Sequence, residues 1–100
     1  MTLEEFQQTI DTKTLPPRLS NPLTALWYDA QGDWEKAHDY AQQNNDSASA
    51  WVHAYLHRKE DDLSNANYWY VRASRTMPDQ RLEEEWQFIA QTLLEEEYTG

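Results

Sequence analysis

The strongest constraint on the fold is a helical stripe of large apolar side chains in the middle of the chain. Its members have the i, i+3, i+4, i+7 and i+8 spacing of one helix face: Ala48, Trp51, Val52, Tyr55 and Leu56. After a polar turn at residues 60–62, a second stripe leads to Pro78: Leu63, Ala66, Tyr70, Ala73 and Met77. The segment Ala50–Pro78 therefore predicts two helices joined by a tight turn.

The composition favours an all-α fold. The chain has only two Gly and four Pro in 100 residues, whereas a fold of short strands and turns needs turn residues roughly every ten positions. A chain of this length forms one domain with a modest core. We expect a single all-α domain of five or six helices over residues 1–100.

Residues 1–22 predict an N-terminal helix followed by a proline-rich arm. The TLEE sequence near the start is a capping box, in which the side chains of Thr2 and Glu5 satisfy first-turn amides. The adjacent prolines 16 and 17 disfavour a regular helix in the arm. The arm could be a ligand for another domain, but we favour a packed loop.

Residues 23–78 predict two helical hairpins, and residues 79–100 predict a cap helix with an acidic tail. The first hairpin turns at Gly32, which ends one helix, and Asp33 caps the next. In the cap helix the predicted core-facing residues share one stripe: Leu82, Trp86, Ile89, Ala90 and Leu93.

The two predicted hairpins repeat one pattern at an offset of 29 residues, from Gly32 to Asp61. In each copy a helix ends in the turn, a bulky residue follows, and an alanine comes three positions later, at Ala37 or Ala66. Antiparallel helices joined by so short a turn approach closely, and a small residue fits at their crossing.

This pattern resembles the tetratricopeptide repeat. The second copy carries the small, aromatic and small residues of that family at Ala66, Tyr70 and Ala73, and Pro78 closes the unit. The first copy departs from the family, because Ala41 stands where an aromatic residue is usual and the closing proline is missing. The resemblance implies stacked antiparallel hairpins, with the N-terminal helix and arm on one side and the cap helix on the other.

The chain also resembles a family of small bacterial proteins of unassigned activity with an H-R-x-E-G-D-x-x-N-A-x-Y-W-Y-x-R-A core. Here the core runs from His57 to Ala73, and Asp61 stands at the usual turn glycine. Asp61 must then form the turn. Its backbone could adopt the left-handed conformation, which Asp tolerates better than most residues. This resemblance implies a fold and no activity.

The charge distribution bears on possible partners. The net charge of −10 opposes nucleic-acid binding, which needs a basic face. Residues 51–81 nevertheless carry five Lys/Arg against four Asp/Glu, so the central region is a less acidic island. An anionic ligand is expected there, if there is one.

Several classes of protein are excluded or disfavoured. There is no Cys, which excludes disulfides, thiolate metal sites and a thiol nucleophile. No apolar run approaches the roughly 20 residues of a membrane span. The start lacks the basic and apolar regions of a signal peptide, so we expect a soluble, cytoplasmic protein without membrane contact.

A group of residues in the central hairpin is not explained by packing, and we predict it as the binding surface: His53, His57, Arg58, Tyr68, Trp69 and Arg72. A partly exposed Trp beside Arg can stack on a planar ligand or hold a cation. The arginines could bind a carboxylate or phosphate, or form internal ion pairs, and we favour internal pairs: Arg58, Arg72 and Arg75 with Glu60, Asp61, Asp62 or the C-terminal glutamates.

His53 and His57 lie one helical turn apart, which is the spacing of a two-histidine metal site. A third ligand would have to come from Glu60 or from another helix, such as His38 or Asp39. The favoured interpretation is that both imidazoles hydrogen-bond to the neighbouring helix, so we expect no metal and no cofactor.

No nucleophile–base pair, Gly-rich phosphate loop or G-x-S-x-G motif indicates catalysis. We therefore expect a non-catalytic binding module for a protein or peptide partner. One alternative is that the same residues bind a small anionic or aromatic molecule. The protein is a monomer or forms a homodimer through exposed tryptophans.

Overall fold

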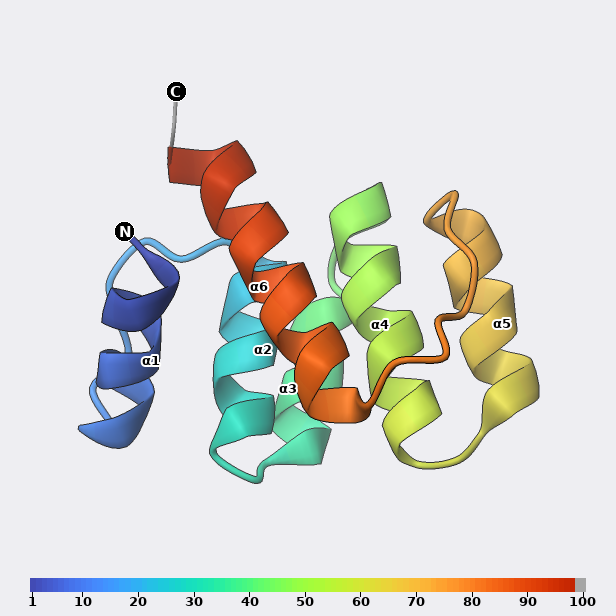
Figure 1. The fold of residues 1–100 in the computed structure, drawn as a ribbon, viewed down its shortest axis with the longest axis horizontal. Coiled ribbons are helices and arrows are strands. Elements are labelled where there is room, and N and C mark those ends of the chain that lie inside the picture. Colours follow the sequence, from blue (N-terminus) through green and yellow to red (C-terminus); the bar gives the residue numbers. More distant parts are fainter. Residues whose placement is uncertain (99–100) are drawn as a thin grey trace.

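The structure is a computed structural model that describes the backbone of residues 1–98 and the side chains of residues 1–97. Within this range the chain forms six α-helices and no strand: α1 (Leu3–Asp11), α2 (Asn21–Ala30), α3 (Trp34–Ala41), α4 (Ser47–Lys59), α5 (Leu63–Arg72) and α6 (Leu82–Tyr98). The predicted all-α class is confirmed. Figure 1 shows α2–α3 and α4–α5 as two neighbouring hairpins, with α1 beside α2.

The two hairpins turn through the same backbone geometry. Gly32 and Asp61 both have left-handed backbone, with φ of +85° and +65°. At each turn the amide of the following residue donates to the carbonyl five positions earlier, at 3.0 Å and 2.9 Å. The side chains of Asp33 and Asp62 then accept the amide three positions on, at 3.1 Å and 3.4 Å, and cap α3 and α5. The left-handed conformation expected of Asp61 is confirmed.

Small residues lie where the helices of each hairpin meet. Ala37 on α3 and Ala66 on α5 are fully buried, as the sequence repeat predicts. The two hairpins contact each other mainly through α3 against α4 and α2 against α4. The indole N–H of Trp34 strengthens this contact by donating to the carbonyl of Leu56 at 2.9 Å.

Helix α6 lies across the hairpins instead of capping the stack. It packs against α4, α2 and α1, and in Figure 1 it crosses in front of α2 and lies beside α4. Phe6 of α1 stacks on Trp86 of α6 with ring centroids 6.0 Å apart, and the Trp86 indole donates to the carbonyl of Leu26 at 3.1 Å. The expected placement of the N-terminal and cap helices on opposite sides is therefore wrong.

Helix α6 lies across the hairpins because of its long apolar stripe. Of the residues predicted to face the core, Leu82 is partly buried against it. The others are buried, together with Leu94: Trp86, Ile89, Ala90 and Leu93. The apolar faces of α2 and α4 and the aromatic ring of Phe6 together cover this long stripe. No helix in the described part of the chain is long and apolar enough to cross a membrane.

A buried carboxylate ties α6 to the second hairpin. Glu85 is 1% exposed and accepts hydrogen bonds from Arg58 Nη1 at 2.8 Å and from the Tyr70 hydroxyl. Arg58 also donates through Nη2 to the carbonyl of Gln80, just before α6. Burial, reinforced by Glu85, raises the pKa of Tyr70 well above its usual range, so the phenol stays a donor.

Replacing Arg58 by Met should strongly destabilise the fold, because it leaves the Glu85 carboxylate buried without its cation. We expect the free energy of unfolding in urea to fall by about 3 kcal/mol. The matched control is Arg81→Met, since Arg81 pairs with Glu84 at 3.4 Å in an exposed position. An exposed ion pair contributes about 0–1 kcal/mol to the free energy of unfolding. Equal effects of the two variants would contradict the proposed role of Glu85.

Candidate functional site: a histidine cluster beside an open helix

The three histidines of the chain meet between the two hairpins. His53 and His57 lie one turn apart on α4, and the packing of α3 against α4 brings His38 to them. The Nε2 atoms of His38 and His53 are 2.9 Å apart, and one nitrogen of each of the three rings lies within 4.8 Å of the others. We call His38, His53 and His57 the histidine cluster.

Two tryptophans enclose the histidine cluster. The Trp34 ring stacks on His38 with centroids 5.0 Å apart and an interplanar angle of 10°. On the other side the Trp69 ring stacks on His53 at 4.0 Å and 15°. One wall comes from α3 and the other from α5, so both hairpins hold the imidazoles in place.

The third imidazole is oriented by polar partners of its own. His57 Nδ1 lies 2.6 Å from Glu60 Oε1, and Asn65 Nδ2 lies 3.3 Å from His57 Nε2. A carboxylate accepts and an amide NH₂ donates. The contacts therefore assign the proton to Nδ1 and leave the lone pair on Nε2.

Burial keeps the two hydrogen-bonded imidazoles neutral. His53 is 5% exposed, and burial, with smaller contributions from His38 and His57, lowers its pKa to about 4. Burial also lowers the pKa of His38, with His57 the next cause. At neutral pH one ring of this pair donates an N–H and the other offers a lone pair, which is what the 2.9 Å contact requires.

Five of the six residues predicted for the binding surface form a continuous group. From His57 and His53 the group continues through half-buried Trp69 to the exposed side chains of Arg72 and Tyr68. The Arg72 guanidinium lies 5.2 Å from the Trp69 ring centroid and donates to the Tyr68 hydroxyl at 3.3 Å. The hydrogen bond between His53 and His38 of α3 is of the kind expected from the sequence, in which an imidazole bonds to the neighbouring helix.

Arg58 does not belong to this group. It projects toward α6, where it pairs with buried Glu85. The expected internal ion pair is thus found for Arg58, with Glu85 as the acid. Arg72 and Arg75 differ from that expectation, since neither takes part in an ion pair among the described residues, and Arg75 lies 3.3 Å from the ring centroid of Trp51.

Two residues of the site, His38 and Trp34, are not among the residues predicted for the binding surface. The sequence indicates His38 only as one possible third metal ligand, and Trp34 is the bulky residue that follows the first turn. Both lie on α3, eight residues long, at i and i+4, which puts them on one face of that helix. This spacing was visible, but their position beside His53 depends on how the hairpins pack.

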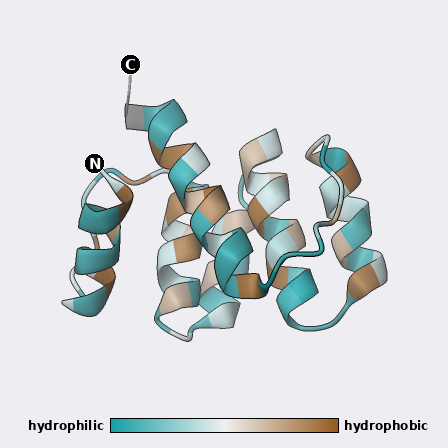
Figure 2. Ribbon diagram, viewed as in Figure 1, coloured by the Kyte–Doolittle hydropathy of each residue, from teal (hydrophilic) through white to brown (hydrophobic). Residues whose placement is uncertain are grey.

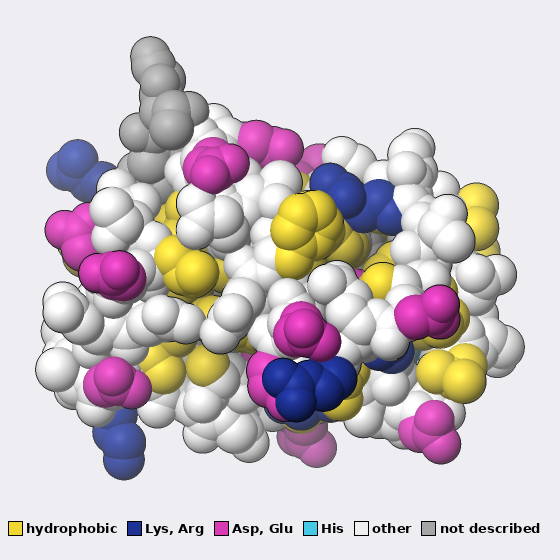
Figure 3. Space-filling model, in the orientation of Figure 1, with side chains coloured by type: hydrophobic (Ala, Val, Ile, Leu, Met, Phe, Trp, Pro, Cys, Tyr) yellow, Lys and Arg dark blue, Asp and Glu magenta, His cyan; other side chains and the backbone are white. Residues whose placement is uncertain are grey.

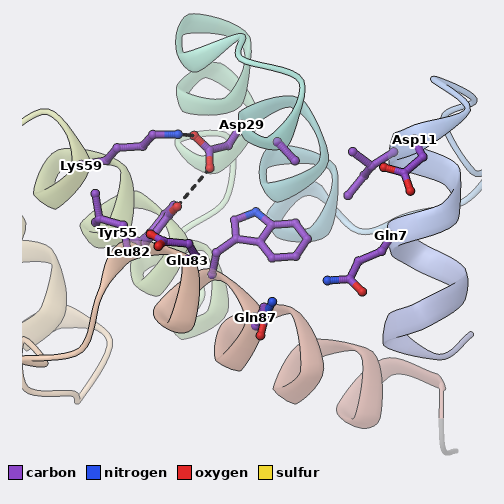
Figure 4. A pocket seen from close by; sticks show the side chains of 11 residues that line it. Gln7, Asp11, Asp29, Tyr55, Lys59, Leu82, Glu83 and Gln87 are labelled. Atoms are coloured by element: carbon purple, nitrogen blue, oxygen red, sulfur yellow. Dashed lines mark hydrogen bonds and ion pairs between the residues drawn. The ribbon is translucent and has the colours of Figure 1, made fainter.

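A separate cleft of about 560 Å³ opens between α1, α2, α4 and α6 (Figure 4). Buried Asp29 lies at its wall and accepts hydrogen bonds from the Tyr55 hydroxyl at 3.2 Å and from Lys59 Nζ at 2.9 Å. None of the six residues predicted for the binding surface lines this cleft. A small molecule held there would therefore not be bound by those residues.

The outer surface of α5 is open. Helix α5 lies at the end of the molecule opposite α1 in Figure 1 and packs mainly on α4. Its outward side chains Leu63, Tyr68 and Val71 are 50%, 53% and 66% exposed. Figure 2 shows hydrophobic segments near both ends of α5, and Figure 3 shows yellow side chains at that end of the molecule. We call Leu63, Tyr68 and Val71 the outer face of α5.

Comparison of the chain with protein-family models, with curated proteins and with solved structures gave no match.

The stability of the protein should depend on pH through His53. Above about pH 6.5 the imidazole is neutral in both the folded and the unfolded chain. Below that pH the unfolded chain binds a proton that the folded chain excludes until about pH 4. The free energy of unfolding should therefore fall on acidification through this window, by an amount on the order of 3 kcal/mol from this group.

Urea denaturation at several pH values between 4 and 7, in metal-free buffer, measures this dependence. The matched variant His53→Gln keeps a polar amide opposite His38 but cannot titrate. It should have a shallower dependence of stability on pH than the wild type, whatever its stability at pH 7. The same slope in both proteins would contradict the burial of a neutral imidazole at this position.

Proposed function

We propose that this protein is a non-catalytic binding module that recognises a helical segment of a partner protein through the outer face of α5. The observation that carries the proposal is the path of α6. Because α6 covers α4, α2 and α1, the last helix of the hairpin stack keeps its apolar outer side chains in contact with solvent. Stacked hairpins bury such a face against a further helix.

The dimensions of this surface favour a single helix as the occupant. Helix α5 has ten residues and is therefore about 15 Å long, or three turns. Leu63 and Val71 lie two turns apart along it, with Tyr68 beside them. An amphipathic helix of similar length, packed ridge into groove along α5, would cover all three side chains.

The charge at the Val71 end of the outer face favours an acidic residue on the partner at that end. Arg72 follows Val71 directly and is exposed, and none of the ion pairs among the described residues involves it. A carboxylate on the partner helix could accept two parallel hydrogen bonds from the Arg72 guanidinium. We therefore favour a different protein as the partner, with an acidic residue opposite Arg72.

A displayed library of amphipathic helical peptides, about 14 residues long and with acidic flanks, tests this function. Peptides enriched on the purified protein are synthesised, and their affinities are measured by fluorescence anisotropy. Val71→Ser should weaken binding roughly tenfold, because the valine side chain contributes about 1.5 kcal/mol when buried. Arg72→Gln should weaken binding and reduce its dependence on salt.

The matched control is Phe88→Ser, because Phe88 is 51% exposed but lies on α6. This variant should bind the enriched peptides like the wild type. Peptides that lose affinity for Phe88→Ser but not for Val71→Ser would contradict the proposed surface. A concentration-dependent dimer in size-exclusion chromatography that Val71→Ser abolishes would contradict the proposed partner, since a second copy would then occupy the outer face.

A further inference from the structure

We propose that the histidine cluster is a binding site for a divalent transition-metal ion of the zinc type. His38, His53 and His57 each place one ring nitrogen within 4.8 Å of the other two. Three imidazole nitrogens with an open fourth position are a known ligand set for zinc. The inference concerns the interior between the hairpins and does not depend on what binds the outer face of α5.

The distances require only small movements of the rings. Bonds of 2.0–2.1 Å in tetrahedral geometry place ligand nitrogens about 3.3 Å apart. The Nε2 atoms of His38 and His53 are already 2.9 Å apart in the structure. Rotations of the imidazoles that separate this pair slightly and draw in His57 would bring all three to that spacing.

The protonation states suit a metal ion. A metal needs the lone pair of a neutral imidazole, so protons compete with it for the site. His38 and His53 are held neutral by burial, and the Glu60 carboxylate holds the proton of His57 on Nδ1. A carboxylate behind a ligating histidine fixes the tautomer and makes the ring a stronger ligand.

The residues packed against the histidine cluster restrict how its rings can move when a metal ion binds. The stacked rings of Trp34 and Trp69 limit rotation of His38 and His53 about their long axes. Binding would exchange the His38–His53 hydrogen bond and the Asn65 contact of His57 for bonds to the ion. Since α3 and α4 both supply ligands, a bound ion would join the two hairpins and stabilise the folded chain.

The test uses the untagged full chain, stripped with a chelator and dialysed. Calorimetric titration with Zn²⁺ or Co²⁺ should show one site per chain, and either ion should raise the melting temperature. Mg²⁺ is the matched control, because it prefers oxygen ligands and would report on the acidic surface alone. Bound Co²⁺ should give the intense visible absorption of a four- or five-coordinate site.

Nuclear magnetic resonance of the wild type identifies the ligands without any substitution. The chain has only three histidines, so an imidazole ¹⁵N spectrum reports on the cluster alone. One equivalent of Zn²⁺ should shift one nitrogen of each ring. Zn²⁺ that shifts none of the rings, or that binds no more tightly than Mg²⁺, would overturn the proposal.

Substitutions separate ligation from packing. His38→Gln and His53→Gln should each reduce Zn²⁺ affinity at least tenfold, and Glu60→Gln should reduce it 10–100-fold, which is typical for such carboxylates. Asp62→Asn is the matched control for Glu60, since the Asp62 side chain is also an exposed acid near His57 but accepts from the amide of Asn65 and makes no hydrogen bond to the imidazole. Folded histidine variants with unchanged Zn²⁺ affinity would also overturn the proposal.

Discussion

Burial of the apolar stripe of α6 against α4, α2 and α1 decides which surfaces of the two hairpins remain open. The contact is both apolar and polar, because Trp86 stacks on Phe6 while Glu85 receives Arg58 and Tyr70. A carboxylate that is 1% exposed is tolerated only with such partners. Through Tyr70 on α5 and Arg58 on α4, the same carboxylate also fixes the second hairpin relative to α6.

The two sides of α4 therefore differ in chemistry. Toward α6 it presents Trp51 and Arg58, which contact Phe88 and Glu85 and complete the core. Away from α6 it presents His53 and His57 to α3 and α5, and none of the histidines is visible in Figure 3, in which α6 lies in front. Stacked imidazoles in the interior and an uncovered α5 beside them are the features that packing alone does not require. The proposed metal site and the proposed partner surface rest on these two features separately.

Local chemistry made much of the fold predictable. The turn at Asp61, the caps at Asp33 and Asp62 and the small residues at the helix crossings depend on near neighbours in the chain, which the sequence displays. The path of α6 was not predictable in the same way, because an amphipathic stripe shows which face is buried but not what covers it. Likewise, Arg58 shares a helix with His57, yet only the position of Glu85 determines where its guanidinium points. His38 could be considered with His53 from the sequence, but their contact follows from the packing of α3 on α4.

The contact between the first and last helices tests this account most directly, because it places α6 across the hairpins instead of on α5. Two-dimensional nuclear Overhauser spectroscopy of the labelled protein can detect it through the rings of Phe6 and Trp86, whose centroids are 6.0 Å apart. The account predicts cross-peaks between the ring protons of these two residues and none from α6 to the side chain of Val71. Cross-peaks from Ile89 or Leu93 to Val71, without any between Phe6 and Trp86, would show that α6 caps the stack and would contradict the account.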